Sequence, residues 1–335
     1  MSDIARRAGV SRAAVSYSLN GLPGVSEPTR RKVLEIAAEL GFEPNVAAKA
    51  MHGAATGAVG LVLRRPLGSL SIEAFRRQFI SGVEAEIANH SYGLLLQFVP
   101  DLATEIKAYE QWWGQRSADG FLLLSLRADD PRVEVIERLR APAVVVGGPD
   151  PKVRVPNLWT DDAAALTEAV EYLVGLGHRH IVRLAGPPEM LHVAMRSRAF
   201  DTACRRLGVS GSATSVPGGY SREEAQQVTR KLLSSSPRPT AIIYDNDVAA
   251  LAGLAVAREM GVGVPGELSV VGWEDSSLCE AVRPALTVIR RDVVAYGRQA
   301  ARMLMNAIGG RPAGMIQGEV PRLKVRGSTG PVPRR

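Results

Sequence analysis

The stretch Gly9-Val10-Ser11-Arg12-Ala13-Ala14-Val15-Ser16 decides the fold at the start of the chain. Gly9 ends a short polar helix predicted over residues 2–8, because glycine readily takes the left-handed conformation that stops a helix. Ser11 follows a tight turn and is placed to cap a second helix over residues 12–19. The stretch therefore predicts two short helices joined by a glycine-containing turn.

The second predicted helix has one apolar and one outward face. Val15 and Leu19 share the side toward the first helix. The outward side chains are Arg12, Ala13 and Tyr17. A short helix that follows such a turn and presents an arginine near its N-terminus has the geometry of a helix that enters the DNA major groove.

A third helix is predicted from Ser26 to Gly41, with Glu27 and Pro28 in its first turn. Its apolar stripe is expected to cover the first two helices and consists of Val33, Ile36, Ala37 and Leu40. Spacing alone fits a generic bundle of three helices equally well, so the residue identities must decide between the two interpretations.

These identities resemble the lactose repressor/galactose repressor family in one ordered series. The matching segments are Gly9 to Ser16, Leu19-Asn20-Gly21, Gly24-Val25-Ser26, Thr29-Arg30, Val33-Leu34, Leu40-Gly41-Phe42 and Pro44-Asn45. The resemblance implies a DNA-binding helix-turn-helix headpiece over residues 1–52.

The resemblance also implies a role for individual side chains. It places Arg12, Ala13 and Tyr17 at the positions that read base edges. Tyr17 stands where many members have arginine, so no member's operator sequence is transferred to this chain. The residues implied near phosphates, which fix register without reading sequence, are Ser11, Ser16, Thr29 and Arg30.

A hinge helix over residues 45–52 is implied next. It contains Asn45 and Met51, and Met51 matches the apolar wedge that enters the minor groove, where leucine is usual. Such a wedge unstacks a base step and kinks the duplex. The alternative, a continuation of the third helix, conflicts with Pro44, because proline breaks helices. Residues 53–57 are then a flexible linker.

The N-terminal end is polar and lacks the apolar core of a secretory signal. The chain is therefore expected in the cytoplasm, associated with the nucleoid. Only Met1 and Ser2 precede Asp3, where the family has a few more residues. Either Ser2 caps the first helix or the natural start lies upstream.

From residue 57 onward, apolar runs alternate with amphipathic stretches. Strands are predicted at 59–63, 93–98, 121–126, 143–146, 181–184, 241–244 and 268–273. Helices are predicted near 72–89, 102–114, 131–140, 162–176, 196–207, 222–234 and 247–260. Alternation of this kind predicts βαβ units and parallel sheets. The fold class is therefore α/β: an all-α headpiece plus a body of two doubly wound lobes, with a ligand cleft at the carboxyl ends of the strands.

The body resembles the same family. The matching segments are Leu176 to Ile181, Ala185-Gly186-Pro187, Pro239 to Ile242, Asn246-Asp247, Leu268 to Asp275 and Arg283 to Thr287. The resemblance implies a periplasmic-binding-protein-like effector-binding and dimerisation domain over residues 58–335. It implies one lobe at about 58–156 and 285–316, and another at about 157–284 and 317–330.

The family's ligand positions map onto both lobes. The implied effector-binding residues are Phe75, Arg76, Arg196, Tyr220, Asn246, Asp247 and Glu274. A carboxylate, an arginine and stacking aromatic side chains suit a polyhydroxylated ring, so the expected effector is a sugar or a nucleoside. Three departures favour a more acidic ligand: Glu274 replaces the usual aspartate, Gly147 stands where several members have a pocket aspartate, and Arg76 is charged where an aromatic residue is common.

Composition agrees with a nucleic-acid partner and gives no sign of a cofactor. The net charge is +7 and the pI about 9.7, which favours association with polyanions. No apolar run is long enough to span a bilayer. Cys204 and Cys279 are too few for a disulfide framework. His178 and His180 have no cysteine or acidic partner in metal-ligand spacing, so no metal is expected.

The sequence therefore predicts a DNA-binding repressor that is not an enzyme. We expect a homodimer that reads a near-palindromic operator and changes its operator affinity when a carbohydrate-like molecule binds. One rival is a two-lobed sugar-binding receptor without a regulatory role, which the headpiece argues against. Another is an enzyme on a doubly wound fold, for which no set of nucleophile and base is visible in the sequence.

Overall fold

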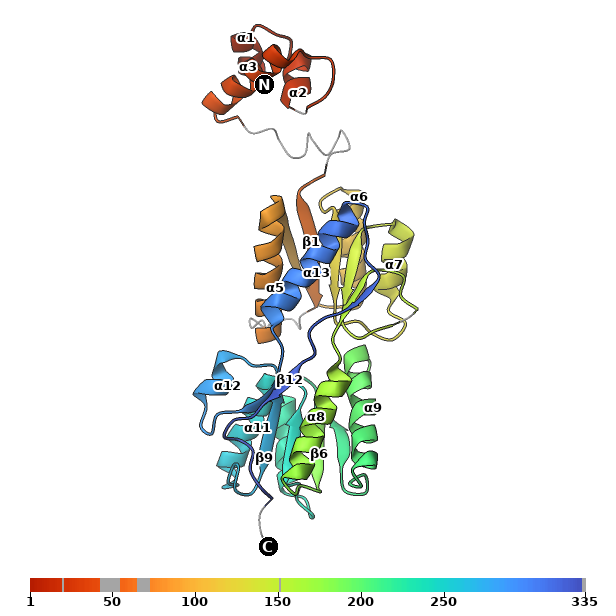
Figure 1. Cartoon of the computed structure of the whole chain (residues 1–335), viewed down its shortest axis with the longest axis vertical. Coiled ribbons are helices and arrows are strands. Elements are labelled where there is room, and N and C mark those ends of the chain that lie inside the picture. The colour runs from red at the N-terminus through yellow and green to blue at the C-terminus, as the bar shows by residue number, and fades with distance from the viewer. Residues whose placement is uncertain (20, 43–54, 65–72, 151, 333–335) are drawn as a thin grey trace.

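The computed structural model describes residues 1–19, 21–42, 55–64, 73–150 and 152–332. The predicted hinge helix, including Asn45 and Met51, lies outside these residues. Within them, the chain forms a small helical unit followed by a larger body of two lobes, which follow one another along the long axis (Figure 1). Over the part of the chain that the structure describes, none of the helices has the length and apolar character needed to cross a bilayer.

The headpiece consists of α1 (Ser2–Ala8), α2 (Arg12–Leu19) and α3 (Glu27–Glu39). Gly9 ends α1 with a φ of 72°, in the left-handed region as predicted. Ser11 Oγ accepts a hydrogen bond from Ala14 N at 3.1 Å, which confirms its role as the cap of α2. No side chain caps α1, so Ser2 is the first residue of that helix and not its cap.

The core of the headpiece joins all three helices. Ile4, Val15 and Val33 are almost fully buried. Leu40, predicted to lie in the apolar stripe of the third helix, is 39% exposed, so that prediction was wrong. The helix ends at Glu39, and the chain turns back so that Phe42 packs against the core instead.

Each lobe contains a six-stranded sheet. The sheet of the first lobe has the order β11-β5-β4-β3-β1-β2, with every pairing parallel. Its strands are β1 (Ala58–Arg64), β2 (Gly93–Val99), β3 (Gly120–Leu124), β4 (Ala143–Val146), β5 (Asn157–Trp159) and β11 (Met315–Gln317).

The sheet of the second lobe has the order β12-β10-β9-β8-β6-β7, and only β12 runs antiparallel to its neighbour. Its strands are β6 (Ile181–Ala185), β7 (Thr214–Pro217), β8 (Ala241–Tyr244), β9 (Ser269–Trp273), β10 (Thr287–Arg290) and β12 (Arg322–Lys324).

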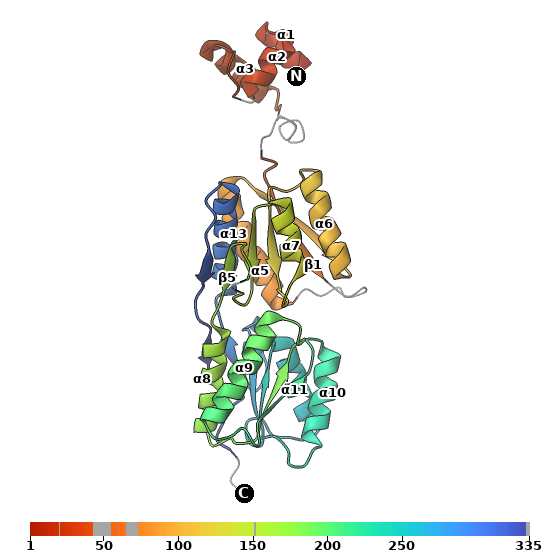
Figure 2. The same ribbon diagram turned by 90° about the vertical axis from the view of Figure 1, so that its right-hand side faces the viewer.

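Helices cover both faces of each sheet, as Figures 1 and 2 show for the first lobe. There α5 (Ala74–Ile87) and α13 (Val293–Ile308) lie side by side on one face, and α6 (Leu102–Gly114) and α7 (Pro131–Leu139) cover the other. The short η1 (Ala88–His90) follows α5. In the second lobe α8 (Asp162–Gly175) and α9 (Leu191–Arg206) cover one face, α10 (Arg222–Leu233) and α11 (Asp247–Glu259) the other, and α12 (Ser277–Ala281) projects beside them.

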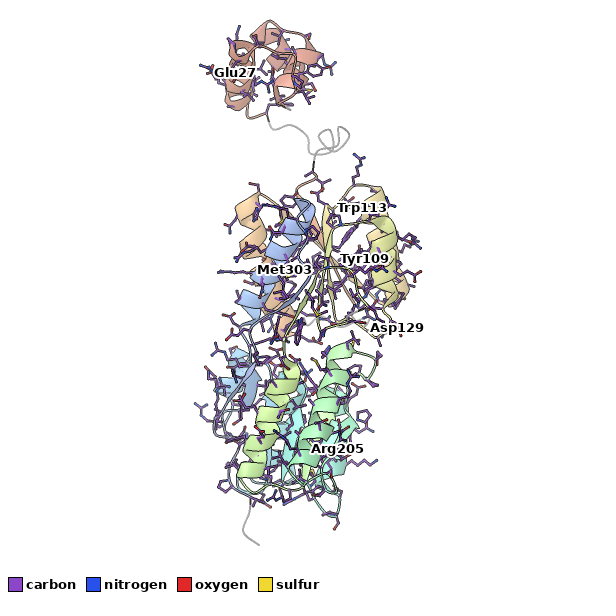
Figure 3. The ribbon with its side chains drawn as sticks, turned by 45° about the vertical axis from the view of Figure 1, so that its right-hand side comes forward. Glu27, Tyr109, Trp113, Asp129, Arg205 and Met303 are labelled. Atoms are coloured by element: carbon purple, nitrogen blue, oxygen red, sulfur yellow. The ribbon has the colours of Figure 1, made fainter. Side chains whose placement is uncertain are left out.

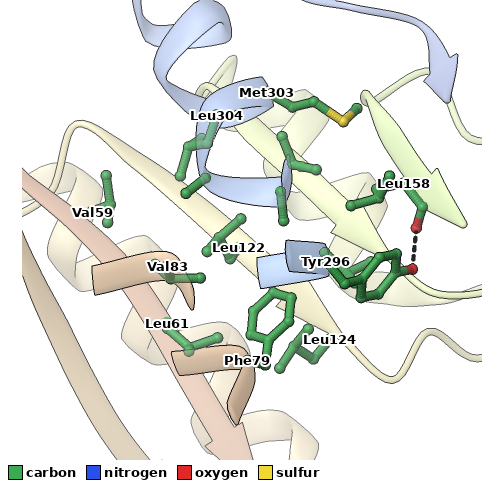
Figure 4. Packing of buried hydrophobic residues seen from close by; sticks show 14 of the residues in the cluster. Val59, Leu61, Phe79, Val83, Leu122, Leu124, Leu158, Tyr296, Met303 and Leu304 are labelled. Atoms are coloured by element: carbon green, nitrogen blue, oxygen red, sulfur yellow. Dashed lines mark hydrogen bonds between the residues drawn. The ribbon is translucent and has the colours of Figure 1, made fainter. Parts of the chain in front are cut away.

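The core of the first lobe shows why its sheet strands are apolar on both faces. Leu61 and Val59 point toward α5 and α13, whereas Val62 faces α6 and α7. In Figure 4 the ring of Phe79 packs edge-on against Tyr296, at 6.3 Å between centroids. The hydroxyl of Tyr296 donates to the carbonyl of Leu158 at 2.9 Å, which satisfies the polar end of this buried side chain.

The chain crosses between the lobes at positions that differ by a few residues from those expected. Residues 157–159 were expected in the second lobe, but β5 pairs with β4 in the first. Residues 287–290 were expected in the first lobe, but β10 pairs with β9 in the second. The cause is strand pairing: β5 adds to the sheet of the first lobe, and β10 to that of the second, before the chain leaves that lobe.

Candidate functional site

A cavity of about 670 Å³ lies between the two lobes, at the carboxyl ends of their strands. Arg64, Leu124 and Val146 end or follow strands of the first lobe and line it on one side. Asp245 and Trp273 do the same for the second lobe. Figure 3 shows Asp129 at the rim of the first lobe, on the side that faces the second. This is the place where the α/β topology was expected to put a ligand.

The structure brings together all of the predicted effector residues except Asp247. Those that line the cavity are Phe75, Arg76, Arg196, Tyr220, Asn246 and Glu274. Asp247 lies one residue further along α11, outside the cavity wall, and its Oδ1 accepts from Val248 N at 2.9 Å. Asn246 caps α11 through Ala249 N at 2.7 Å. Gly147 also lines the cavity.

Arg196 is held rigidly in the wall of the second lobe. Its Nε and Nη2 donate to Asp162 Oδ2 at 2.8 and 2.6 Å, and its Cζ lies 3.4 Å from the centroid of the Trp273 ring. Burial acts to raise the pKa of Asp162, but the charges of Arg196 and Arg291 outweigh it and hold that pKa below its usual value. The guanidinium is thus already neutralised before a ligand binds.

Glu274 and Arg291 form a second buried ion pair where the lobes meet. Arg291 Nη2 donates to Glu274 Oε1 at 2.6 Å, and Arg291 Nη1 donates to Thr160 Oγ1 at 2.9 Å. Burial raises the pKa of Glu274 although Arg291 opposes the shift. Glu274 also has a φ of 72°, a strained conformation for a residue other than glycine, which is typical of functional positions.

On the second-lobe side of the cavity, three buried polar atoms have no hydrogen-bond partner among the described residues. They are Trp273 Nε1, Glu274 Oε2 and Arg291 Nε, and all three residues line the cavity. A buried donor or acceptor without a partner is costly, so a ligand that supplies matching groups gains free energy. Two donors and one acceptor in one wall match a ligand with hydroxyl groups, which both donate and accept.

An aromatic wall completes the second-lobe side. The rings of Tyr220 and His192 are nearly parallel, 4° apart in orientation, with centroids at 6.3 Å. A hydrogen bond of 2.6 Å joins His192 Nε2 to the Tyr220 hydroxyl. Burial, with a contribution from the nearby charge of Arg196, lowers the pKa of His192 to about 3, so the imidazole is neutral.

The first-lobe side is polar but internally paired. Arg132 donates to Asp130 and, at 2.6 Å, to Glu105. Arg64 lies 3.0 Å from the other oxygen of Glu105. Arg76 donates to the Arg64 carbonyl at 2.9 Å, so it braces the end of β1. These contacts leave little positive charge without a carboxylate partner.

Sequence reasoning missed several residues of this site. They are Asp162, His192, Asp245, Trp273 and Arg291. A signal was present for three of them, because Trp273 ends β9, Asp245 directly follows β8 and Arg291 directly follows β10. The rule that ligands bind at the carboxyl ends of parallel strands singles out these positions.

The headpiece presents its predicted base-reading residues to solvent. Ser11, Arg12 and Ala13 are exposed, and Tyr17 is 45% exposed. Ser16 is half-buried on the same helix. The arrangement matches a recognition helix with its N-terminal half accessible.

The residues predicted near phosphates on α3 have internal partners. Thr29 Oγ1 shares a hydrogen bond of 2.8 Å with Ser26 Oγ. Arg30 Nη2 donates to the Leu22 carbonyl at 2.6 Å. Arg30 therefore braces the segment between α2 and α3, in addition to any role at the DNA backbone.

A helix-turn-helix headpiece joined to a two-lobed body with an interlobe cavity defines a class of ligand-responsive DNA-binding proteins. Two family models match this chain and narrow the class to one family. Residues 1–45 match the family described as bacterial regulatory proteins, lacI family, and residues 170–329 match a periplasmic binding protein-like domain.

Known proteins agree over nearly the whole chain. The HTH-type transcriptional regulator CelR of Thermobifida fusca is 31% identical over 315 residues, which are 92% of this chain and 91% of CelR. A solved CelR–cellobiose complex has a TM-score of 0.73 at 28% identity and covers 97% of this chain and 98% of that one. The lac repressor dimer bound to operator and the anti-inducer ONPF has a TM-score of 0.84 at 26% identity and covers 98% of both chains. The chain therefore belongs to the lacI family of bacterial regulatory proteins and is a helix-turn-helix transcriptional regulator.

Proposed function

We propose that the protein is a homodimeric repressor whose operator affinity is set by a neutral sugar, of up to disaccharide size, bound in the interlobe cavity. Residues 1–52 are the DNA-binding headpiece with its hinge, residues 53–57 the linker, and residues 58–335 the effector-binding and dimerisation domain. The protein acts in the cytoplasm on chromosomal DNA and is not an enzyme. The carboxylates of Asp162 and Asp245 support the last point, because each is bound to an arginine and is not available as a general acid or base.

The pairing of charges in the cavity is the observation that carries the choice of ligand. The arginines that line it each have a carboxylate within ion-pair distance: Arg64 with Glu105, Arg76 with Glu73, Arg127 with Glu189, Arg132 with Asp130, Arg196 with Asp162 and Arg291 with Glu274. An acidic ligand would have to break such pairs. This argues for an uncharged ligand and against the acidic one that the sequence departures favoured.

The polar atoms without a partner and the aromatic wall argue for a sugar. Glu274 Oε2 accepts a ligand hydroxyl, Trp273 Nε1 and Arg291 Nε donate to ligand oxygens, and the flat Tyr220–His192 wall suits the apolar face of a pyranose ring. The cavity volume of about 670 Å³ lies within the range of small-molecule sites. CelR, a relative that binds cellobiose in its solved complex, supports a neutral disaccharide.

A homodimer is supported by the edge of the first-lobe sheet. β2 is the last strand of that sheet, and its Leu94, Leu95 and Leu96 are only partly buried. A partly exposed apolar edge strand is unfavourable for a monomer and is covered when two copies pair by two-fold symmetry. Two headpieces related in this way match a near-palindromic operator. On the DNA we place Arg12, Ala13 and Tyr17 at base edges, Ser11, Ser16, Thr29 and Arg30 at phosphates, and Asn45 and Met51 at the hinge contacts.

The test starts with selection of duplexes from a random pool on the full-length protein. Fluorescence anisotropy then measures affinity for the selected duplex with and without cellobiose, maltose, a uronic acid and a nucleoside. We expect a neutral disaccharide to raise the Tm and to change operator affinity by roughly 5- to 150-fold. Glu274→Gln should lower the affinity for the sugar and leave the affinity for DNA in the absence of sugar unchanged. Absence of any sequence preference among duplexes would refute the proposal, and a response to the uronic acid alone would refute the neutral ligand.

A further inference from the structure

Arg183 occupies an unusual position inside the second-lobe sheet, on a strand with a neighbour on each side. It lies on β6, which pairs with β7 on one side and β8 on the other. Its side chain is 0% exposed. Every other residue of this strand is apolar, so a charged guanidinium here must be compensated by internal partners.

Those partners come from three other elements. Arg183 Nε and Nη2 donate to the two carboxylate oxygens of Asp245 at 2.9 and 2.5 Å, which is a bidentate ion pair. Arg183 Nη1 donates to Ser197 Oγ on α9 at 2.9 Å and to Ser215 Oγ on β7 at 3.1 Å. The guanidinium thus joins β6, β7, the end of β8 and α9 beneath the cavity.

Asp245 connects this network to the cavity wall through two further hydrogen bonds. Its Oδ2 accepts from Gly186 N at 3.0 Å, and its carbonyl accepts from Arg196 Nη1 at 3.2 Å. Gly186 in turn lies directly against Tyr220, because a Cβ at that position would overlap the phenol ring. The Arg183–Asp245 pair therefore fixes the turn at Gly186, against which Tyr220 packs. It also fixes one hydrogen bond of Arg196.

Stability alone does not account for the Arg183–Asp245 pair. A buried ion pair pays a desolvation cost that often equals its attraction, and an apolar pair of similar volume is frequently as stable. An apolar pair has no acceptor for Gly186 N, however, so it leaves that turn unfixed. What the charged pair adds is an acceptor that fixes the position of the Gly186 turn.

We propose that Arg183 and Asp245 are positioning residues of the cavity, which hold the Gly186 turn and through it the Tyr220–His192 wall in the place where the ligand binds. This role rests on the proposed function, in which the cavity is the effector site. Neither side chain needs to touch the ligand, since both carboxylate oxygens of Asp245 are already used.

The experiment compares Arg183→Met, Asp245→Ala and the double variant with the wild-type full chain. Arg183→Met leaves the Asp245 carboxylate buried without its partner, so its Tm should fall. The double variant should recover most of that Tm, because no buried charge remains. Hydrogen exchange of residues 185–190 and 218–222 should nevertheless stay faster than in wild type, and affinity for cellobiose should be lower by roughly tenfold or more.

Thr229→Val is the matched control. Thr229 is buried in the same lobe and shares a hydrogen bond of 3.0 Å with the Tyr244 hydroxyl, away from the cavity. It should lower the Tm without changing exchange at residues 185–190. If hydrogen exchange of residues 185–190 and 218–222 in the double variant is as slow as in wild type, the positioning role is wrong. If no sugar binds the wild-type protein, the proposed effector fails, but the exchange measurement still decides whether the pair holds the wall.

Discussion

Arg127 of the first lobe donates to Glu189 of the second across 3.1 Å, so an ion pair joins the two lobes beside the cavity. The backbone adds a second link, because Leu191 N donates to the Leu126 carbonyl at 2.9 Å. The ion pair is partly exposed, at 31% for Arg127 and 45% for Glu189. Solvent screening therefore limits its contribution to roughly 0.2–1 kcal/mol.

Removal of the Arg127–Glu189 pair should favour the conformation in which the two lobes are further apart. We expect Arg127→Gln to shift the population toward separated lobes by no more than about fivefold, which is the equivalent of about 1 kcal/mol. Small-angle scattering and sugar affinity measure the shift. Glu189→Gln should have the same effect, and the double variant no more than either single change, because all three lose one interaction. Additive effects would show that the two side chains act separately.

A second prediction concerns Asp119, which clamps the entry of the chain into the first lobe. Its two oxygens accept from Thr56 N and Gly57 N, each at 2.8 Å. Asparagine has only one acceptor oxygen, so Asp119→Asn loses one charge-assisted bond, worth about 1.5–3 kcal/mol locally. We expect weaker coupling between sugar and operator, with sugar affinity unchanged, because Thr56 and Gly57 are the last residues of the linker between headpiece and body.

Operator affinity with and without saturating sugar measures this coupling. Asp150→Asn is the control, because Asp150 also accepts a backbone hydrogen bond, from Lys152 N at 3.0 Å, in an exposed loop of the same lobe. Faster exchange at residues 55–58 should accompany the Asp119 change. If exchange is faster but the coupling is unaltered, the hydrogen bonds of Asp119 have no part in the coupling between sugar binding and operator binding.

A third prediction follows from the close crossing of α5 and α13. A Cβ on Gly82 would overlap the Val294 carbonyl, and a Cβ on Gly297 would overlap the Phe79 carbonyl. Alanine normally stabilises a helix by up to about 1 kcal/mol relative to glycine. Here the obstacle is backbone, so Gly82→Ala or Gly297→Ala should lower the free energy of unfolding by about 1–3 kcal/mol.

Urea denaturation tests this, with Gly114→Ala as the control. Gly114 ends α6, and nothing lies within 4 Å of a Cβ built there. That variant should be neutral or slightly more stable. Equal stability of Gly82→Ala and Gly114→Ala would contradict the close packing of α5 and α13.

Much of the body was predictable because its long elements have strong local patterns. β3 is buried at every residue and was expected as a continuous apolar run. The predicted helix at 102–114 matches α6. Topology predicted the cleft at the ends of such strands, and the family resemblance named Asn246 and Glu274, both of which line the cavity.

The remainder depends on contacts between distant parts of the chain. β5 and β11 have three residues each and pair with one another across the first-lobe edge, so neither has a periodic pattern of its own. The positions of the lobe crossings depend on these short strands. Arg183 within an apolar strand was visible in the sequence, but its partner Asp245 follows a different strand, β8, and only the fold joins them.

The headpiece offers a prediction that separates base reading from bracing. Arg12 is exposed on α2, so Arg12→Ala should cost about 1–3 kcal/mol on the preferred duplex and relax the preference at one base position. Arg30 donates to the Leu22 carbonyl, so Arg30→Ala should lower affinity for all duplexes and also lower headpiece stability. Selection from a randomised operator, with thermal unfolding of the same variants, distinguishes the two. A relaxed base preference with Arg30→Ala would reverse the assignment.

The last prediction uses the pH dependence of stability. Desolvation and the charge of Arg196 lower the pKa of His192 to about 3, whereas the unfolded chain has an ordinary imidazole that gains a proton below about pH 6.5. As the pH falls through this range, the unfolded state binds a proton that the folded state does not. The contribution of His192 to stability is therefore complete above about pH 6.5 and is lost toward pH 3, by at most about 1.4 kcal/mol per pH unit.

Urea denaturation at about pH 7 and about pH 5.5 measures this slope. His192→Asn removes the titrating group, so its free energy of unfolding should fall less between the two pH values than that of wild type. The slope and not the absolute stability is compared, because the variant also loses the hydrogen bond to Tyr220 at every pH. Parallel curves for wild type and His192→Asn would mean that the imidazole titrates alike in both states.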